Sequence, residues 1–339
     1  MDTEKHELPL EKIPANRQLV EELYSHGKIT WEAREYALSL LYPNRQWGLW
    51  ISRLLSTIGT ALILAGIIYF FAFNWVKITP AVKLISIQVG FIACLVGAYS
   101  YSLKRLSGKL LLLSASVLVG VFMAVFGQIY QTGADSYELF MMWSLLTLGW
   151  TLISKFPPQW IFWLIITNIF LVLWWLQSAL PTDEMEFMIF TYMTIFNSIA
   201  LALREYFVVV KGYKYLEARW TRALLIIATL IIMLIPIIFL IFEPSDATKS
   251  IVISAVVGFI GHGIAFFIYR DKLRDMWSLS AVVLSGCIIL ETTFIKIVSE
   301  IIDVDSVSYL LLGLFTITLF TCSITYLRKI AKKMEVDYV

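Results

Sequence analysis

The sequence has little charge and very few side chains of the kinds that hold metals. Only 15% of its 339 residues are charged, against about 25% in typical soluble domains, and it contains three histidines and three cysteines. His6 and His26 precede the first apolar run, so the histidines cannot meet in one zinc site. It contains no H-E-x-x-H, glycine-rich phosphate loop or G-x-S-x-G signature. We therefore expect no metal, no cofactor and none of the enzyme classes those signatures mark.

The cysteines also exclude a disulfide framework. Cys94, Cys287 and Cys322 all lie inside apolar runs, and none belongs to a C-x-x-C or Cys/His cluster. Buried free thiols of this kind behave as small hydrophobic side chains. We expect no external disulfide and no thiol-based site.

Apolar residues in long runs are what the sequence has in excess. They make up 59% of the chain, whose mean hydropathy is +0.78, and a spanning helix needs about 20 of them in succession. The sequence predicts an all-α, polytopic membrane bundle of about ten transmembrane helices. We place these spans at residues 53–73, 81–102, 109–127, 137–154, 159–180, 185–203, 220–242, 250–269, 276–298 and 307–327.

The basic residues predict the orientation of the bundle. With the N-terminus inside and strict alternation of the spans, 23 of the 27 Lys and Arg residues fall on the cytoplasmic side. The four left outside are Lys77, Lys83, Lys249 and Lys296. We therefore expect both termini in the cytoplasm and the segment between the third and fourth spans outside.

Residues 1–46 are predicted to form a short cytoplasmic helical hairpin, followed by the bundle at 47–328 and a basic cytoplasmic tail at 329–339. Gly27 is a candidate C-cap for the first helix and Thr30 an N-cap for the second. A hairpin of this size buries too little area to be stable alone, so we expect it to pack on the membrane face or on a partner. Its second helix has one base and two acids, which disfavours nucleic-acid binding.

The segment FGQIYQTGADSYE, at 126–138, contains glycine, glutamine, tyrosine and acidic residues that a plain connector between two spans does not require. Asp135 and Glu138 resemble a capping box for the next span. Glycines free the backbone, and glutamine amides can replace water as its partners, so we expect the segment to fold back into the outer mouth of the bundle. The candidate ligand-binding and loop-forming residues here are Gly127, Gln128, Tyr130, Gln131, Gly133 and Asp135.

A few polar residues lie deep within the predicted spans. Glu291 is about 9 Å and Gln88 about 12 Å from the outer face by helical rise, and Glu291 must be neutral or paired from another helix. We expect both residues, with His262, to outline an outer polar pocket that Gln128 or Tyr130 approaches. For His262 a simple helix–helix hydrogen bond is the alternative, and we expect Asn168 and Asn197 to serve helix packing.

Two short motifs resemble a bacterial family of membrane proteins of unknown function. The first motif, G-x-I-T-x-E-x-A in the family, reads G-x-I-T-x-E-A here and is formed by Gly27, Ile29, Thr30, Glu32 and Ala33. The second, G-Q-I-Y-x-x-G, is formed by Gly127, Gln128, Ile129, Tyr130 and Gly133. The resemblance implies a bacterial inner-membrane location and a GDYXXLXY-type membrane protein as partner, because genes of the two kinds are often neighbours. It implies no activity.

Two functions from different classes follow from these residues. One is a carrier for a small solute or lipid headgroup, with the 127–135 segment as an outer gate over Glu291. The other is a non-transporting accessory or structural subunit of a cell-envelope complex, with the segment as a docking surface. A carrier needs polar residues facing a continuous wet cavity, whereas a subunit has its buried polar groups paired. An intramembrane hydrolase using Glu291 and His262 is disfavoured, because their estimated depths differ by about 7 Å.

Overall fold

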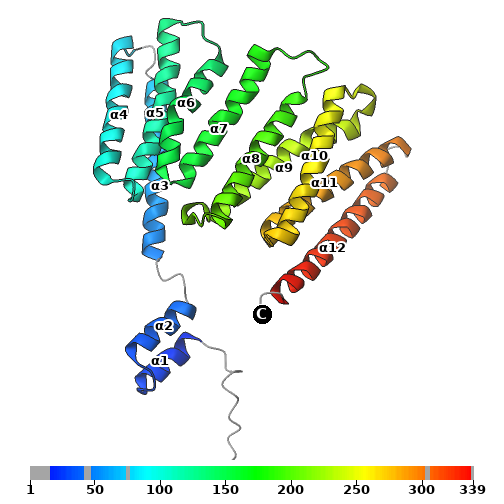
Figure 1. The fold of residues 1–339 in the computed structure, drawn as a ribbon, viewed down its shortest axis with the longest axis horizontal. Helices are drawn as coiled ribbons and strands as arrows, with labels where there is room; N and C mark the ends of the chain where they lie inside the picture. Colours follow the sequence, from blue (N-terminus) through cyan, green and yellow to red (C-terminus); the bar gives the residue numbers. More distant parts are fainter. Residues whose placement is uncertain (1–15, 42–46, 74–76, 302–305, 337–339) are drawn as a thin grey trace, which may run out of the picture. The chain divides into compact units, whose positions relative to one another are not determined.

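The computed structural model describes residues 16–41, 47–73, 77–301 and 306–336 (Figure 1). Its contacts divide the chain into two compact units, Met1–Asn74 and Trp75–Val339, so the first long apolar helix groups with the N-terminal hairpin. Every regular element in the described ranges is helical, which confirms the all-α class. The parts of the predicted hairpin domain at 1–15 and 42–46, and the tail end at 337–339, lie outside the described residues.

The first unit begins with a two-helix hairpin, α1 (Arg17–Ser25) and α2 (Trp31–Leu41). Gly27 follows α1 with φ of +64°, a left-handed conformation that glycine adopts without strain. The Thr30 hydroxyl accepts a hydrogen bond of 3.2 Å from the N–H of Ala33, as an N-cap does. Both helix-end signals expected from the sequence are therefore confirmed.

One ion pair and a small apolar contact join the two helices of the hairpin. Arg34 on α2 donates from Nε and Nη2 to the two carboxylate oxygens of Glu21 on α1, at 2.8 and 2.6 Å. Val20 and Leu38 are the buried apolar side chains. Solvent screens an ion pair at the surface, so the hairpin gains little stability from it. After it comes α3 (Trp47–Phe73), which is long and apolar enough to span a membrane.

The second unit is a series of long helices, each packed mainly on its neighbours in the chain. They are α4 (Pro80–Tyr101), α5 (Leu106–Tyr130), α6 (Ser136–Ser154), α7 (Pro157–Trp174), α8 (Met188–Val209), α9 (Arg219–Phe242), α10 (Lys249–Phe267), α11 (Met276–Ile301) and α12 (Ser306–Val336). Figure 1 shows them as a row from α4 to α12, in which α9 contacts α8, α10 and α11. Short π-helical turns extend α7 through 175–179 and α10 through 268–272.

Contacts between non-consecutive segments show that the helices alternate in direction. The Nζ of Lys109, at the start of α5, donates to the carbonyl of Lys155, at the end of α6, at 3.3 Å. At the other end, the N–H of Tyr137 donates to Oε1 of Gln177 at 3.0 Å. We call the first end the basic end of the second unit. Its connecting loops are residues 102–105, 155–156, 210–218 and 273–275.

Eight helices in the described ranges are long and apolar enough to cross a membrane, so the chain is a multi-pass membrane protein. The two long helices outside this set are α6 and α8, of 19 and 22 residues. Both stand where the sequence predicts spans, so the ten predicted spans correspond to ten long helices. Their lower hydropathy comes from polar side chains, many of which are buried against neighbouring helices.

Hydroxyl and amide groups join α5, α6 and α7. Gln159, fully buried at the start of α7, donates to the Ser116 hydroxyl on α5 at 2.7 Å. The indole of Trp143 on α6 donates to the carbonyl of Ser116, also at 2.7 Å. A Cβ at Gly120 would lie 2.3 Å from that indole, so only glycine permits the contact. These residues allow the three backbones to pack closely in a medium that offers no water.

Small residues also bring α10 against α9. A Cβ added at Gly258 would lie 2.9 Å from the carbonyl oxygen of Met233, and one at Gly261 would overlap the Met233 side chain. These two glycines therefore permit the close approach of α10 to α9, whereas Gly263 faces open space. Close approach strengthens dispersion contacts, which drive helix association where lipid is as apolar as the side chains.

The end of the chain is helical where the sequence predicts a tail. The helix α12 continues to Val336, so most of the predicted tail extends the last span. Met334 is buried in a cluster with Tyr269 and Leu279. The basic residues at 328–333 therefore lie at the basic end, with those of the α8–α9 and α10–α11 loops.

The orientation of the bundle remains a prediction that labelling can test. In a chain whose three cysteines are replaced by alanine, Cys at Thr132 should react with an impermeant thiol reagent in whole cells, and Cys at Lys211 should not. Both positions are exposed at opposite ends of the second unit, so reactivity reports the side of the membrane. The reversed pattern would place the basic end outside.

Candidate functional site at the basic end of the bundle

The glutamine- and glycine-containing segment is mostly helix. Because α5 extends to Tyr130, Gly127 and Gln128 belong to its last turn, and the connecting loop is only residues 131–135. Gln131 ends the helix in the left-handed region, with its N–H bonded to the carbonyl of Gly127. The expectation of an irregular segment beginning at Gly127 was wrong, because glycine does not prevent a helix whose other residues favour it.

The loop itself is exposed on the second unit. Residues 131–135 are all exposed, and Asp135 stands at the N-cap position of α6 without a capping hydrogen bond from its side chain to the described residues. Tyr130 contacts Phe126 of its own helix, with ring centroids 4.6 Å apart and the ring planes tilted by 45°. A groove of about 600 Å³ between α5 and α6 includes Gln128 and Asp135 in its lining. These groups therefore share a surface groove.

The predicted outer pocket is not assembled. Gln88 is exposed on α4, which packs on α5, whereas Glu291 is on α11, which packs on α9, α10 and α12. Oε1 of Glu291 accepts a hydrogen bond of 2.7 Å from the Thr316 hydroxyl on α12. Neither Gln128 nor Tyr130 is on a helix that packs against α11. Similar depth in the membrane does not bring residues together when their helices are far apart in the row.

The other predicted polar residues join neighbouring helices. His262 is buried, with Nε2 2.7 Å from the Ser285 hydroxyl on α11 and Nδ1 2.8 Å from the carbonyl of Gly258. The amide of Asn197 donates to Oδ1 of Asn168 at 2.7 Å, across α8 and α7. All these side chains therefore have partners on adjacent helices or on their own backbone.

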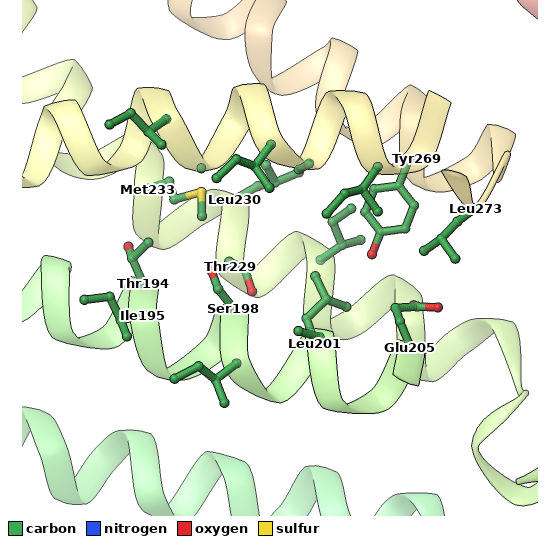
Figure 2. Close-up of a pocket in the computed structure, with 18 of the residues that line it drawn as sticks. Thr194, Ile195, Ser198, Leu201, Glu205, Thr229, Leu230, Met233, Tyr269 and Leu273 are labelled. Atoms are coloured by element: carbon green, nitrogen blue, oxygen red, sulfur yellow. The ribbon is translucent and has the colours of Figure 1, made fainter. Parts of the chain in front are cut away.

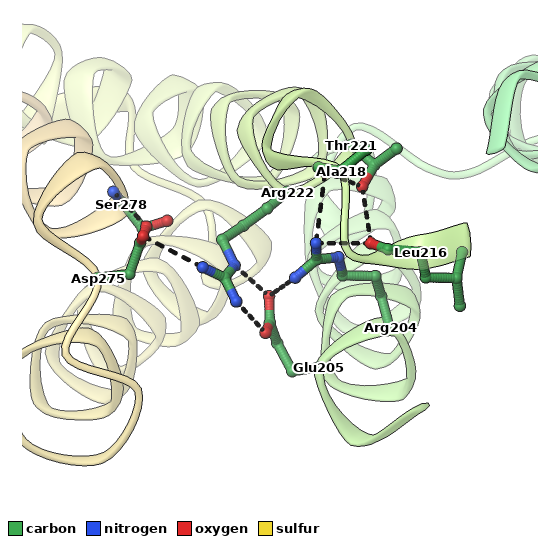
Figure 3. Close-up of polar contacts among 8 residues, drawn as sticks. All are labelled: Arg204, Glu205, Leu216, Ala218, Thr221, Arg222, Asp275 and Ser278. Atoms are coloured by element: carbon green, nitrogen blue, oxygen red, sulfur yellow. Dashed lines mark hydrogen bonds and ion pairs between the residues drawn. The ribbon is translucent and has the colours of Figure 1, made fainter. Parts of the chain in front are cut away.

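A group of buried and partly buried charges lies at the basic end, and Figure 3 shows it. Glu205 on α8 accepts from Arg204 at 2.8 Å and, through both oxygens, from Nε and Nη2 of Arg222 on α9 at 2.8 Å. Arg222 also lies 3.2 Å from Asp275, just before α11. We call Arg204, Glu205, Arg222 and Asp275 the charge network. It connects three helices that are distant in sequence.

The loop between α8 and α9 is fixed by the same network. Arg204 donates from Nη2 to the carbonyl of Leu216 at 2.7 Å, and the Thr221 hydroxyl donates to that of Ala218 at 2.7 Å. Loop carbonyls that would otherwise need water are thus satisfied by side chains. The arginine therefore acts on the backbone as well as on Glu205.

The position of Asp275 controls its ionisation. Burial raises the pKa of the Asp275 carboxyl. Hydrogen bonding from Ser278 and the charge of Arg222 together lower this pKa by more than burial raises it, so it lies below the usual value. The resulting stabilisation is present above the usual carboxyl pKa and is lost as the pH falls through the lowered folded value. The carboxylate is therefore ionised, and paired with Arg222, at neutral pH.

A groove of about 680 Å³ runs from the charge network along α8, α9 and α10. Figure 2 shows Glu205 and Leu273 near one end, with Thr194 and Met233 near the other. Its lining is mainly aliphatic, interrupted by hydroxyl groups such as that of Thr229. Such a surface suits hydrocarbon chains more than polar solutes. Among the described residues, no three His, Cys, Asp or Glu side chains are grouped to hold a metal ion.

Sequence reasoning missed the charge network because it counted Arg204 and Arg222 only among the basic residues of the cytoplasmic side and did not consider Glu205 or Asp275. One signal was present: Arg204 and Glu205 continue an apolar helical run without a break, where solvent-exposed side chains are not expected. Their partners come from α9 and from the start of α11, which no local pattern connects.

Comparison with known proteins gives one match. The family described as "Predicted membrane protein (DUF2157)" matches residues 21–160, from within α1 to the start of α7. Both motifs that carry the resemblance fall within this stretch. No curated protein and no solved structure matches the chain. The match supports a membrane protein and assigns no activity.

Two alanine substitutions in the 127–133 segment should have opposite effects. Gly133 has φ of +67°, so Gly133→Ala should cost about 1 kcal/mol of stability. A Cβ at helical Gly127 would meet only the Thr132 hydroxyl, at 3.6 Å, so Gly127→Ala should be neutral or stabilising by up to about 1 kcal/mol. Thermal unfolding in detergent measures both. Equal loss in the two variants would contradict the helical assignment of Gly127.

Removing the shared carboxylate should destabilise the bundle strongly. Glu205→Gln keeps the shape of the side chain but leaves Arg204 and Arg222 without its charge in a buried site, which should cost about 3–5 kcal/mol. Asp271→Asn is the matched control, because its pair with Arg270 is exposed and screened by solvent, so its loss should change the stability little. Thermal unfolding in lipid nanodiscs compares them. Similar midpoints would mean that the network does not stabilise the helix packing.

Proposed function

We propose that the protein is a non-transporting membrane subunit that assembles laterally with another protein of the cell envelope. One observation carries the proposal: deep polar side chains that a carrier would use for its cargo are bonded to adjacent helices. Asn168, His262 and Glu291 each have such a partner. These bonds hold the helices together, as expected of a protein whose role is assembly.

A carrier would have to exchange these bonds for bonds to cargo and water. Leaving a buried donor or acceptor without a partner costs about 1–3 kcal/mol, so each exchange opposes an open state. One observation favours the carrier as a second candidate function. Oε2 of Glu291 is buried and has no hydrogen-bond partner among the described residues. A carrier for a small solute or lipid headgroup would work through this carboxylate.

The last helix provides a surface for lateral assembly. In the second unit α12 packs on α11, and none of residues 309–333 is buried. The hydroxyls of Thr318 and Thr325 on its exposed side donate to carbonyls of α12 itself, at 2.8 Å each. A face whose polar groups are already satisfied can meet another helix without desolvation cost, and small side chains permit close approach.

The proposed setting is the bacterial inner membrane, with both termini in the cytoplasm. The basic residues gathered at one end of the second unit support this orientation, since cytoplasmic loops carry the excess of Lys and Arg. The proposed partner is a GDYXXLXY-type membrane protein, and the family resemblance supports it.

Site-specific photo-cross-linking tests the subunit proposal. A benzophenone amino acid at Thr318 should form a cross-link to a second protein in native membranes. The same probe at Ser323, whose hydroxyl lies 3.1 Å from Sγ of Cys287 on α11, should cross-link only within the chain. Cross-links to lipid alone at Thr318 would overturn lateral assembly through α12.

Thiol accessibility distinguishes a carrier from a non-transporting subunit. In the cysteine-free chain, Cys at Thr316 should resist a small water-soluble thiol reagent, because this position faces Glu291 inside the α11–α12 contact. Cys at exposed Thr132 is the positive control. Rapid labelling at Thr316 would show that water reaches Glu291, which would favour the carrier over the subunit.

A further inference from the structure

Two grooves between α9 and α11 share Trp277 and Ser280 and therefore form one continuous depression. The part at the basic end, which we call the polar part, has a volume of about 780 Å³ and includes three arginines and Asp275 in its lining. The part that runs toward the middle of the helices has about 380 Å³ and a mainly apolar lining. We call the whole depression the α9–α11 groove. We propose that it binds one anionic phospholipid, with the head phosphate at the basic end and an acyl chain along the apolar part.

Three arginines line the polar part: Arg219, Arg222 and Arg274. Guanidinium groups donate in a planar fork that matches the oxygens of a phosphate, so arginine suits phosphate recognition better than a point charge does. The first turns of α9 and α11 also face this part of the groove, and their dipoles favour a negative ligand. The geometry therefore offers several donors at the place where a headgroup would lie.

Two carboxylates near the groove are already bonded to other groups. Asp275 lines the groove, but its oxygens are held by Arg222 and by the N–H of Ser278. Glu205 lies between Arg204 and Arg222. Arg219 and Arg274, which line the same part of the groove, are exposed. Basic pockets of this kind between spanning helices, on the cytoplasmic side, bind anionic headgroups.

Two tryptophans mark the depth of the site. Trp220 and Trp277, at the starts of α9 and α11, are 43% and 50% exposed and line the polar part. Exposed indoles at helix ends favour the headgroup level of a bilayer. The arginines beside them would therefore lie level with lipid phosphates, so a bilayer lipid could enter from the side without leaving its leaflet.

The apolar part fits a hydrocarbon chain. Ile227, Ile231, Leu284 and Ile288 line it and are all exposed in the isolated chain. Its deepest polar group, the Ser285 hydroxyl, is bonded to His262 and makes no demand on the ligand. A free phosphate would leave this surface empty, and a polar peptide would have to desolvate its backbone there. A phospholipid satisfies both parts of the groove together.

Lipid binding to the delipidated full-length protein tests the proposal. Native mass spectrometry should show tight binding of one phosphatidylglycerol and much weaker binding of phosphatidylcholine. The double variant Arg219→Ala/Arg274→Ala should bind phosphatidylglycerol more weakly, by about fivefold for each arginine removed. Arg270→Ala is the matched control, because this exposed arginine at the same end does not line the groove, and its binding should match the parent.

A second variant tests the acyl-chain part. Leu284→Trp fills the apolar groove and should also weaken phosphatidylglycerol binding, whereas Leu224→Trp, an exposed position on α9 outside the groove, should not. Inorganic phosphate at equal concentration should not compete. Unchanged lipid binding in the double arginine variant would overturn the proposal. So would full competition by phosphate with no effect of Leu284→Trp, because the site would then bind phosphate alone.

Discussion

Polar groups inside a hydrocarbon medium must find partners within the protein, and this constraint organises the second unit. Glu205 illustrates it: the carboxylate is tolerable within the bundle because Arg204 and Arg222 approach it from two sides. The same arginines hold the α8–α9 loop and reach Asp275 at the start of α11. One buried acid thus determines how α8, α9 and α11 meet. Removing it would leave Arg204 in a buried site without a charged partner.

The same constraint explains why the row of helices has grooves. Each helix is joined to its neighbours by a few polar or close-packed contacts, such as Gln159 with Ser116 and Gly258 with Met233. Between those contacts the aliphatic side chains leave depressions along α8–α10 and along α9–α11. In a bilayer such depressions are filled by lipid chains. A protein built in this way suits lateral assembly and lipid binding, in which a groove receives a chain from the side.

The segment at 126–138 shows how a composition can mislead. Its two glycines and two glutamines suggest an irregular loop, yet α5 continues through Gly127 and Gln128. Of the two glycines, only Gly133 has a backbone conformation that favours glycine. A spanning helix keeps its hydrogen bonds through a glycine because no water competes for them. The side chain of a glutamine in the last turn of such a helix can reach the membrane–water interface without breaking the helix. Residue type therefore located the end of the helix only to within one turn.

The sequence by itself determined the class and the positions of the long helices. Long apolar runs predict spans because a bilayer demands about 20 apolar residues, and Gly27 and Thr30 mark helix ends through local backbone geometry. Only the tertiary structure decided which polar residues meet. Gln88 and Glu291 share a depth but lie on helices that do not pack together, whereas Glu205 and Arg222 do meet. Depth follows from position along one helix. Proximity depends on the order in which helices pack, and side chains distant in the sequence decide that order.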